Sequence, residues 1–255
     1  RLAFAATLVL LSTVAGGSPL DIPNVPLGTG VGVDPNIMLI LDDSGSMQFE
    51  ILPDSLTSSN AYFLFPRPSS PYGGSTYDKA YLGLDDTQDR NVTLRSSARN
   101  VLFYDPNITY QPWRKADGSS YSNINPASAP YDPAGRNNCT INLNTGGMTG
   151  TNCSGTTLSY PITFYVYVGS GSVTDRTNYT RYQYRGGTMY QWRVGTNSNT
   201  EKTLTTMPWG RSVADEVQNF ANWFSYYRSR ILAVQAGVTI AFADLSENFR
   251  VGFCT

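Results

Sequence analysis

Three side chains that carry oxygen, Asp42, Ser44 and Ser46, alternate along a loop that directly follows an apolar run. Carboxylate and hydroxyl oxygens are hard ligands, suited to Mg²⁺, Mn²⁺ or Ca²⁺ rather than to zinc or copper. A loop leaving a strand can turn these alternating side chains towards one point, with Asp43 pointing away. The pattern therefore predicts a divalent-cation site. The alternative is a polar turn that caps the next helix, because Asp and Ser are common capping residues.

Two apolar runs and one helical segment must position this loop. The run Ile37 to Leu41 stops at Asp42, which predicts a strand over 36–41 that is buried on both faces, as in a parallel sheet covered by helices. Ligands of such sheets bind beyond the carboxyl ends of the strands. The sequence FRVGFC (249–254) predicts a second strand, whose direction the sequence leaves open.

The helical segment begins at Ser212, which with Asp215 resembles a capping box. Apolar residues then recur at steps of three and four residues. This spacing predicts one helical face running to about residue 245, with any bend near the pair Tyr226 and Tyr227. The aromatic residues of this face fit a core or an interface equally well.

The segment 48–211 changes composition to Tyr, Ser, Gly, Asn and Pro. Alternating polar and apolar residues predict strands over 160–168, 178–184 and 188–194, with a tight turn at 185–187 between the last two. We expect a small antiparallel sheet, and the many aromatic residues can form a core of their own. The fold class predicted is α/β: an incomplete core interrupted by a long insertion rich in β-strands and loops.

Composition excludes several functions. The chain has 255 residues, a formal net charge of -1 and no histidine, which rules out Ser-His-Asp catalysis and His-bound zinc and argues against a nucleic-acid partner. A phosphotransferase with Asp42 as nucleophile would need a second acid at Ser44, and a hydrolase elbow would need glycines where Asp42 and Ser46 stand. We therefore expect no enzymatic activity. The acids Asp85, Asp86 and Asp89 lack the spacing of an EF-hand loop, which favours a solvated acidic turn.

The N-terminus and the cysteines indicate export. Residues 1–17 combine Arg1, an apolar run and small residues, as in the remnant of a secretory signal, and are too short to span a bilayer. We expect an exported fragment with no transmembrane span in the mature chain. Cys139 and Cys153 flank a Gly- and Asn-rich loop and are predicted to form a disulfide, while Cys254 is expected to be a buried thiol.

The loop at Asp42 resembles the metal-ion-dependent adhesion site of von Willebrand factor A domains, whose first loop reads D-x-S-x-S. The stretches VLFYDPNITYQPW (101–113) and VQNFANWFSYYRSRILAVQAGVTIAF (217–242) resemble the PilC/PilY family of type IV pilus tip-associated adhesins. That resemblance implies an incomplete, Rossmann-like von Willebrand A core. Its first strand and metal loop lie in 18–47, its insertion in 48–211, and its helix and second strand in 212–255. The other two metal loops have no counterpart before residue 255.

The same resemblance implies a function in pilus biogenesis, twitching motility and attachment. A protein of this kind is exported to the pilus tip at the outer-membrane surface and contacts minor pilins and a host-cell or abiotic surface, here through a divalent cation at Asp42, Ser44 and Ser46. The alternative is a structural assembly factor that docks on minor pilins without metal-dependent binding.

Overall fold

The computed structural model describes residues 36–57, 62–68, 77–78, 81–136, 138–149, 160–196, 201–243 and 250–254. Its strands are β1 (Asn36–Ile40), β2 (Arg67–Pro68), β3 (Tyr77–Asp78), β4 (Ala129–Pro130), β5 (Thr140–Ile141), β6 (Met148–Thr149), β7 (Thr163–Tyr167), β8 (Tyr179–Arg185), β9 (Thr188–Arg193), β10 (Lys202–Leu204) and β11 (Arg250–Cys254). The α-helices are α1 (Asp89–Thr93), α2 (Val213–Tyr226) and α3 (Arg230–Ala243), and the 3₁₀ helices are η1 (Gly45–Gln48), η2 (Asp54–Leu56), η3 (Pro126–Ser128) and η4 (Arg176–Asn178). The predicted signal remnant and residues 18–35 lie outside this part of the chain.

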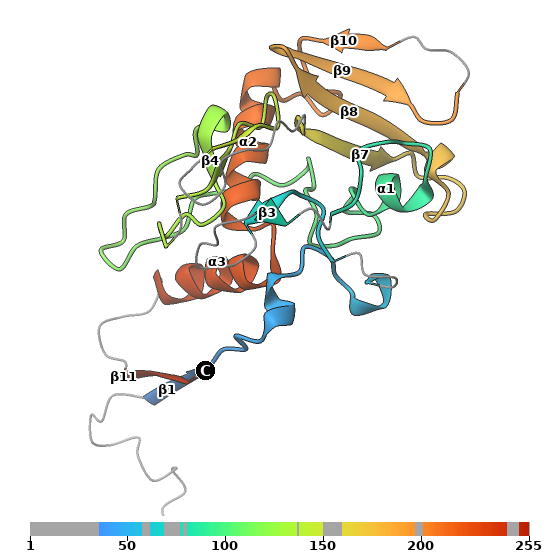
Figure 1. The fold of residues 1–255 in the computed structure, drawn as a ribbon. Coiled ribbons are helices and arrows are strands. Elements are labelled where there is room, and N and C mark those ends of the chain that lie inside the picture. The colour runs from blue at the N-terminus through green and yellow to red at the C-terminus, as the bar shows by residue number, and fades with distance from the viewer. Residues whose placement is uncertain are drawn as a thin grey trace, which may run out of the picture.

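The antiparallel sheet predicted within the insertion is confirmed. It has four strands in the order β10-β9-β8-β7, of which β10 was not predicted (Figure 1). The hairpin between β8 and β9 turns at Gly186 and Gly187, with φ of 55° and 81°. Two successive positive φ values favour glycine and match the twist of the flanking strands. One face of this sheet lies against the central helix through Phe164, Tyr182 and Met189.

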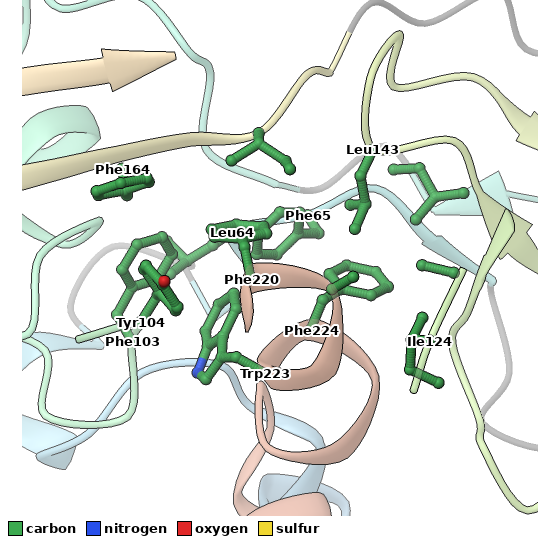
Figure 2. Packing of buried hydrophobic residues seen from close by; sticks show 14 of the residues in the cluster. Leu64, Phe65, Phe103, Tyr104, Ile124, Leu143, Phe164, Phe220, Trp223 and Phe224 are labelled. Carbon is green, nitrogen blue, oxygen red and sulfur yellow. The ribbon is translucent and has the colours of Figure 1, made fainter. Parts of the chain in front are cut away.

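Helix α2 is the centre of the hydrophobic core. Ser212 caps it, because its Oγ accepts a hydrogen bond from the N–H of Asp215 at 3.1 Å. Phe220, Trp223 and Phe224 are almost completely buried and contact Phe65 of the insertion, as Figure 2 shows. The insertion thus packs directly around α2, and one core joins residues on both sides of position 211.

The helical face predicted over 212–245 is two helices, α2 and α3, and α3 lies across the end of α2 (Figure 1). The chain leaves helical geometry at Tyr227, with φ -138°. The side chain of Arg228 then turns into the core, where its Nε donates to Glu50 Oε1 at 3.2 Å and its Nη2 to the carbonyl of Tyr131 at 2.9 Å. Partners distant in sequence therefore hold Arg228 at the break between α2 and α3, at the place where a bend was predicted.

Strands β1 and β11 pair in parallel, with Ile40 opposite Cys254. The prediction that β1 is buried on both faces is wrong for the described residues, because its Met38 and Ile40 are 67% and 76% exposed. Phe253 of β11 is likewise 63% exposed. Parallel strands become buried when further strands and helices flank them. Within the described residues β11 is the strand paired with β1, and α3 reaches the pair through Phe242, whose ring centroid lies 6.2 Å from that of Phe253.

A von Willebrand A core stays a prediction, with which the parallel pairing of β1 and β11 accords. No helix among the described residues is long and apolar enough to cross a membrane.

Candidate metal-binding loop

The loop that carries Asp42, Ser44 and Ser46 leaves the carboxyl end of β1, as predicted. The ladder between β1 and β11 continues one step further, because the N–H of Leu41 donates to the carbonyl of Cys254 at 3.0 Å. The chain then passes through Asp42 and Asp43 into η1. The end of the parallel pair thus fixes the start of the loop.

The three predicted side chains come together. The N–H of Ser44 donates to Asp42 Oδ1 at 2.8 Å, and the hydroxyls of Ser44 and Ser46 are hydrogen bonded at 3.0 Å. The bonds from the Ser44 backbone and side chain lower the pKa of the fully exposed Asp42 carboxyl. Asp43 is exposed as well. The result is one carboxylate and two hydroxyls gathered over five residues, with the carboxylate open to solvent.

The alternative prediction, a polar turn that caps the next helix, is fulfilled only in part. Asp42 accepts the N–H of Ser44, as in an Asx turn, but Ser44, which precedes η1, makes no side-chain capping bond. The two hydroxyls are hydrogen bonded to each other instead of to backbone N–H groups of η1. Their lone pairs therefore remain available to a ligand.

The far end of the loop is anchored to α3 and to the insertion. The carbonyl of Phe49 accepts the N–H of Arg230 at 3.1 Å, and the Phe49 ring stacks on Tyr62 with 4.4 Å between centroids. The side chain of Arg230 donates to the carbonyl of Ile51 at 2.7 Å and pairs with Asp54. Both ends of the loop are thus held by residues far away in sequence, which favours a fixed geometry.

The donor set suits a hard divalent cation, because all three side chains offer oxygen. It supplies a single carboxylate, and no cluster of three or more His, Cys, Asp or Glu residues that could hold a metal occurs in the described ranges. A cation at this loop would therefore complete its shell with water and with oxygens from elsewhere.

The acidic residues Asp85, Asp86 and Asp89, predicted to form a solvated turn, have partners within the chain. Asp85 accepts from Thr87 and Asn91, Asp89 pairs with Arg176 at 3.5 Å, and Asp86 lies 3.7 Å from Arg181. The side chain of Asp86 is only 17% exposed. These carboxylates tie α1 to η4 and β8, so the cluster is structural.

Of the three cysteines, Cys139 is fully buried at the start of the segment that contains β5, whereas Cys153 lies outside the described residues. Their disulfide stays a prediction. Cys254 at the end of β11 is exposed, so the prediction that it is buried is wrong. The cause is again the uncovered β1 and β11 pair.

A second feature near the loop was not predicted from the sequence. A cavity of about 460 Å³ lies between Leu41, the segment 113–121 and α3. Its lining comes from three distant segments without a shared motif. Composition and spacing gave no signal for it.

The two stretches that resemble the PilC/PilY family contact each other. Asn219 accepts the N–H of Tyr110 at 2.8 Å and donates to the carbonyl of Ile108, while Asn222 donates to the carbonyl of Tyr110 at 3.0 Å. Asn side chains of α2 therefore satisfy the irregular backbone of 108–110. Residues of the two stretches thus join α2 to the segment 101–113.

Comparison with known proteins places the chain beside proteins of type IV pilus biogenesis. It is 29% identical over 98% of its length to the type IV pilus biogenesis factor PilY1 of Pseudomonas aeruginosa strain PAK, and 28% identical over 98% of its length to the protein of that name from strain PAO1. The resemblance to the PilC/PilY family is therefore confirmed. The chain spans 18% of the length of these relatives. No family model and no solved structure matches it.

Proposed function

We propose that the chain is a segment of an exported protein that acts at or near the tip of a type IV pilus, promotes pilus assembly and attaches to surfaces through a divalent cation held by Asp42, Ser44 and Ser46. The relatives named as pilus biogenesis factors support the pilus role. The observation that supports the metal site is the meeting of three side-chain oxygens beyond the carboxyl end of β1.

The chemistry of attachment follows from the ligand count. Mg²⁺, Mn²⁺ or Ca²⁺ supplies a Lewis-acidic centre with six or more positions, and this loop fills up to three. Asp42 would contribute the charge, and the two hydroxyls would orient the cation. A carboxylate on a partner can then take an open position, which makes binding depend on both the cation and an acidic group. The protein itself performs no covalent chemistry in this proposal.

The test uses the full-length protein and a matched pair of variants. Asp42→Ala removes the charged ligand, whereas Asp43→Ala removes an equally exposed carboxylate one residue away. Titration calorimetry with Mg²⁺, Mn²⁺ and Ca²⁺ should show affinity at least about tenfold weaker in Asp42→Ala and unchanged in Asp43→Ala. Surface attachment should fall with EDTA and with Asp42→Ala. Equal affinity in both variants would exclude this loop as the site.

The second candidate is an assembly factor that docks on minor pilins without using a metal; the relatives' name, type IV pilus biogenesis factor, favours a role in assembly. In that case Asp42→Ala leaves the number of pili unchanged. Disrupting the contact between Asn222 and the backbone at Tyr110 would reduce it, because it loosens 101–113 from α2. Surface attachment separates the two functions, because it falls in Asp42→Ala only if attachment uses the metal; counting pili by electron microscopy shows in the same cells that assembly is unchanged.

A further inference from the structure

The cavity beside Leu41 has the features of a binding site. Its volume of about 460 Å³ falls in the range of ligand pockets, which cover roughly 300–1,000 Å³. One wall is the segment 113–121, with Trp113 and Tyr121. The other wall is α3, with Gln235 and Val238. Leu41, the residue before Asp42, closes one side. Asp42, Ser44 and Ser46 do not line this cavity.

The wall at 113–121 is preformed. The segment turns back on itself. The N–H of Tyr121 donates to the carbonyl of Trp113 at 2.9 Å, and the N–H of Lys115 donates to the carbonyl of Ser119 at 2.8 Å. Trp113 is 5% exposed, and its Nε1 donates to the carbonyl of Tyr226 at 3.0 Å. The rings of Trp113 and Tyr121 meet at 89°. A ligand would thus meet a rigid aromatic surface, which lowers the entropic cost of binding.

Two basic side chains, Arg114 and Lys115, line the rim of the cavity. Both are exposed, and neither forms an ion pair with a carboxylate of the described residues. Arg114 Nη1 donates to Ser120 Oγ at 3.4 Å, and the Lys115 ammonium lies 5.3 Å from the Tyr121 ring centroid. The cavity therefore offers an apolar floor and positive charge at its rim.

We propose that this cavity captures the C-terminal carboxylate of a polypeptide partner whose last side chain is apolar. The last residue of a chain combines two complementary groups: an apolar side chain for Trp113 and Val238, and a carboxylate for Lys115 and Arg114. Capture of a chain terminus is a known mode of peptide recognition. The charge complementarity at the rim selects this occupant over a neutral apolar segment.

The test uses the full chain and a blocked dipeptide, N-acetyl-alanyl-phenylalanine, with its C-terminal amide as control. Saturation-transfer NMR and calorimetry should show binding of the acid in EDTA, with the amide at least about tenfold weaker because it lacks the charge. Lys115→Gln should weaken binding of the acid several-fold, whereas Lys202→Gln, on exposed β10, should leave it unchanged. Both lysines are on the surface, so neither change threatens folding.

Three results would overturn the proposal. Equal affinity for acid and amide would mean an apolar pocket without charge selection. Phenylacetate binding as tightly as the peptide would show that small carboxylates suffice and that a chain terminus is not selected. Loss of binding in EDTA would assign the probe to the metal loop instead. Failure at this cavity leaves the Asp42 experiment unaffected, because that experiment measures metal affinity.

Discussion

Glu50 lies four residues after Ser46 and connects the metal loop, the insertion and the break between α2 and α3. It is 3% exposed. Its Oε2 accepts the N–H groups of Leu64 and Phe65 at 2.6 and 3.0 Å, and its Oε1 accepts from Arg228 Nε at 3.2 Å. Arg228 is itself 7% exposed, and burial lowers the pKa of its guanidinium. The buried carboxylate of Glu50 and the buried guanidinium of Arg228 therefore neutralise each other.

The substitution Glu50→Gln should cost about 3–5 kcal/mol of the free energy of unfolding, the range for breaking a buried ion pair on one side. The amide oxygen can still accept from Leu64 and Phe65. The amide NH₂, however, would face the N–H of Arg228, which leaves a buried charge without a counterion. In urea the unfolding midpoint should fall by about 1–2 M if the slope is near 3 kcal/mol/M.

The matched control is Glu201→Gln. Glu201 also accepts from two arginines, Arg181 and Arg185, but its side chain is 24% exposed, so its loss should cost about 1 kcal/mol or less. The double variant Glu50→Gln with Arg228→Met should lose less than the sum of the single variants, because it removes both buried charges. A loss below about 1 kcal/mol in Glu50→Gln would refute the reasoning, since the pair would then contribute no more than a surface pair.

Two further predictions concern glycine and tyrosine, and one refines the metal loop. Gly146→Ala should lower the free energy of unfolding in urea by more than about 3 kcal/mol, because φ is +78° and a Cβ would lie 1.6 Å from the backbone nitrogen of Tyr160. The control Gly186→Ala, at φ +55° with open space around the Cβ, should lower it by only about 1–2 kcal/mol. Burial raises the pKa of Tyr110, Tyr160 and Tyr226 to about 12, so their contribution to stability is complete below pH 10 and lost as the pH rises through 12. Absorbance at 295 nm should show these tyrosines ionising together with unfolding, and ionisation near pH 10 would contradict their burial. The lowered pKa of Asp42 keeps its carboxylate charged, so metal affinity should be maintained as the pH falls to the ordinary Asp range near 4. A loss of metal affinity that begins at pH 6 would argue against Asp42 as a ligand.

Local patterns determined the parts of the fold that rest on neighbouring residues. The strands at 163–167, 179–185 and 188–193, the glycine turn between the last two, and the Ser212 cap follow from alternation, positive φ and hydrogen bonds within a few residues. The Asp42, Ser44 and Ser46 cluster belongs to this class, because a five-residue loop can gather its own side chains. The resemblance to the PilC/PilY family also rests on sequence.

Tertiary structure decided what depends on residues far apart. The apolar periodicity continues from α2 into α3, with no glycine or proline at Tyr227 to Ser229, so only the pairing of Arg228 with Glu50, 178 positions away, shows how the break is stabilised. The exposure of β1 depends on which elements flank it, and an apolar run cannot encode that. The cavity near Leu41 exists because three separate segments meet. The sequence thus specified local geometry and the cluster of Asp42, Ser44 and Ser46, while burial, the helix break and the cavity arose from long-range packing.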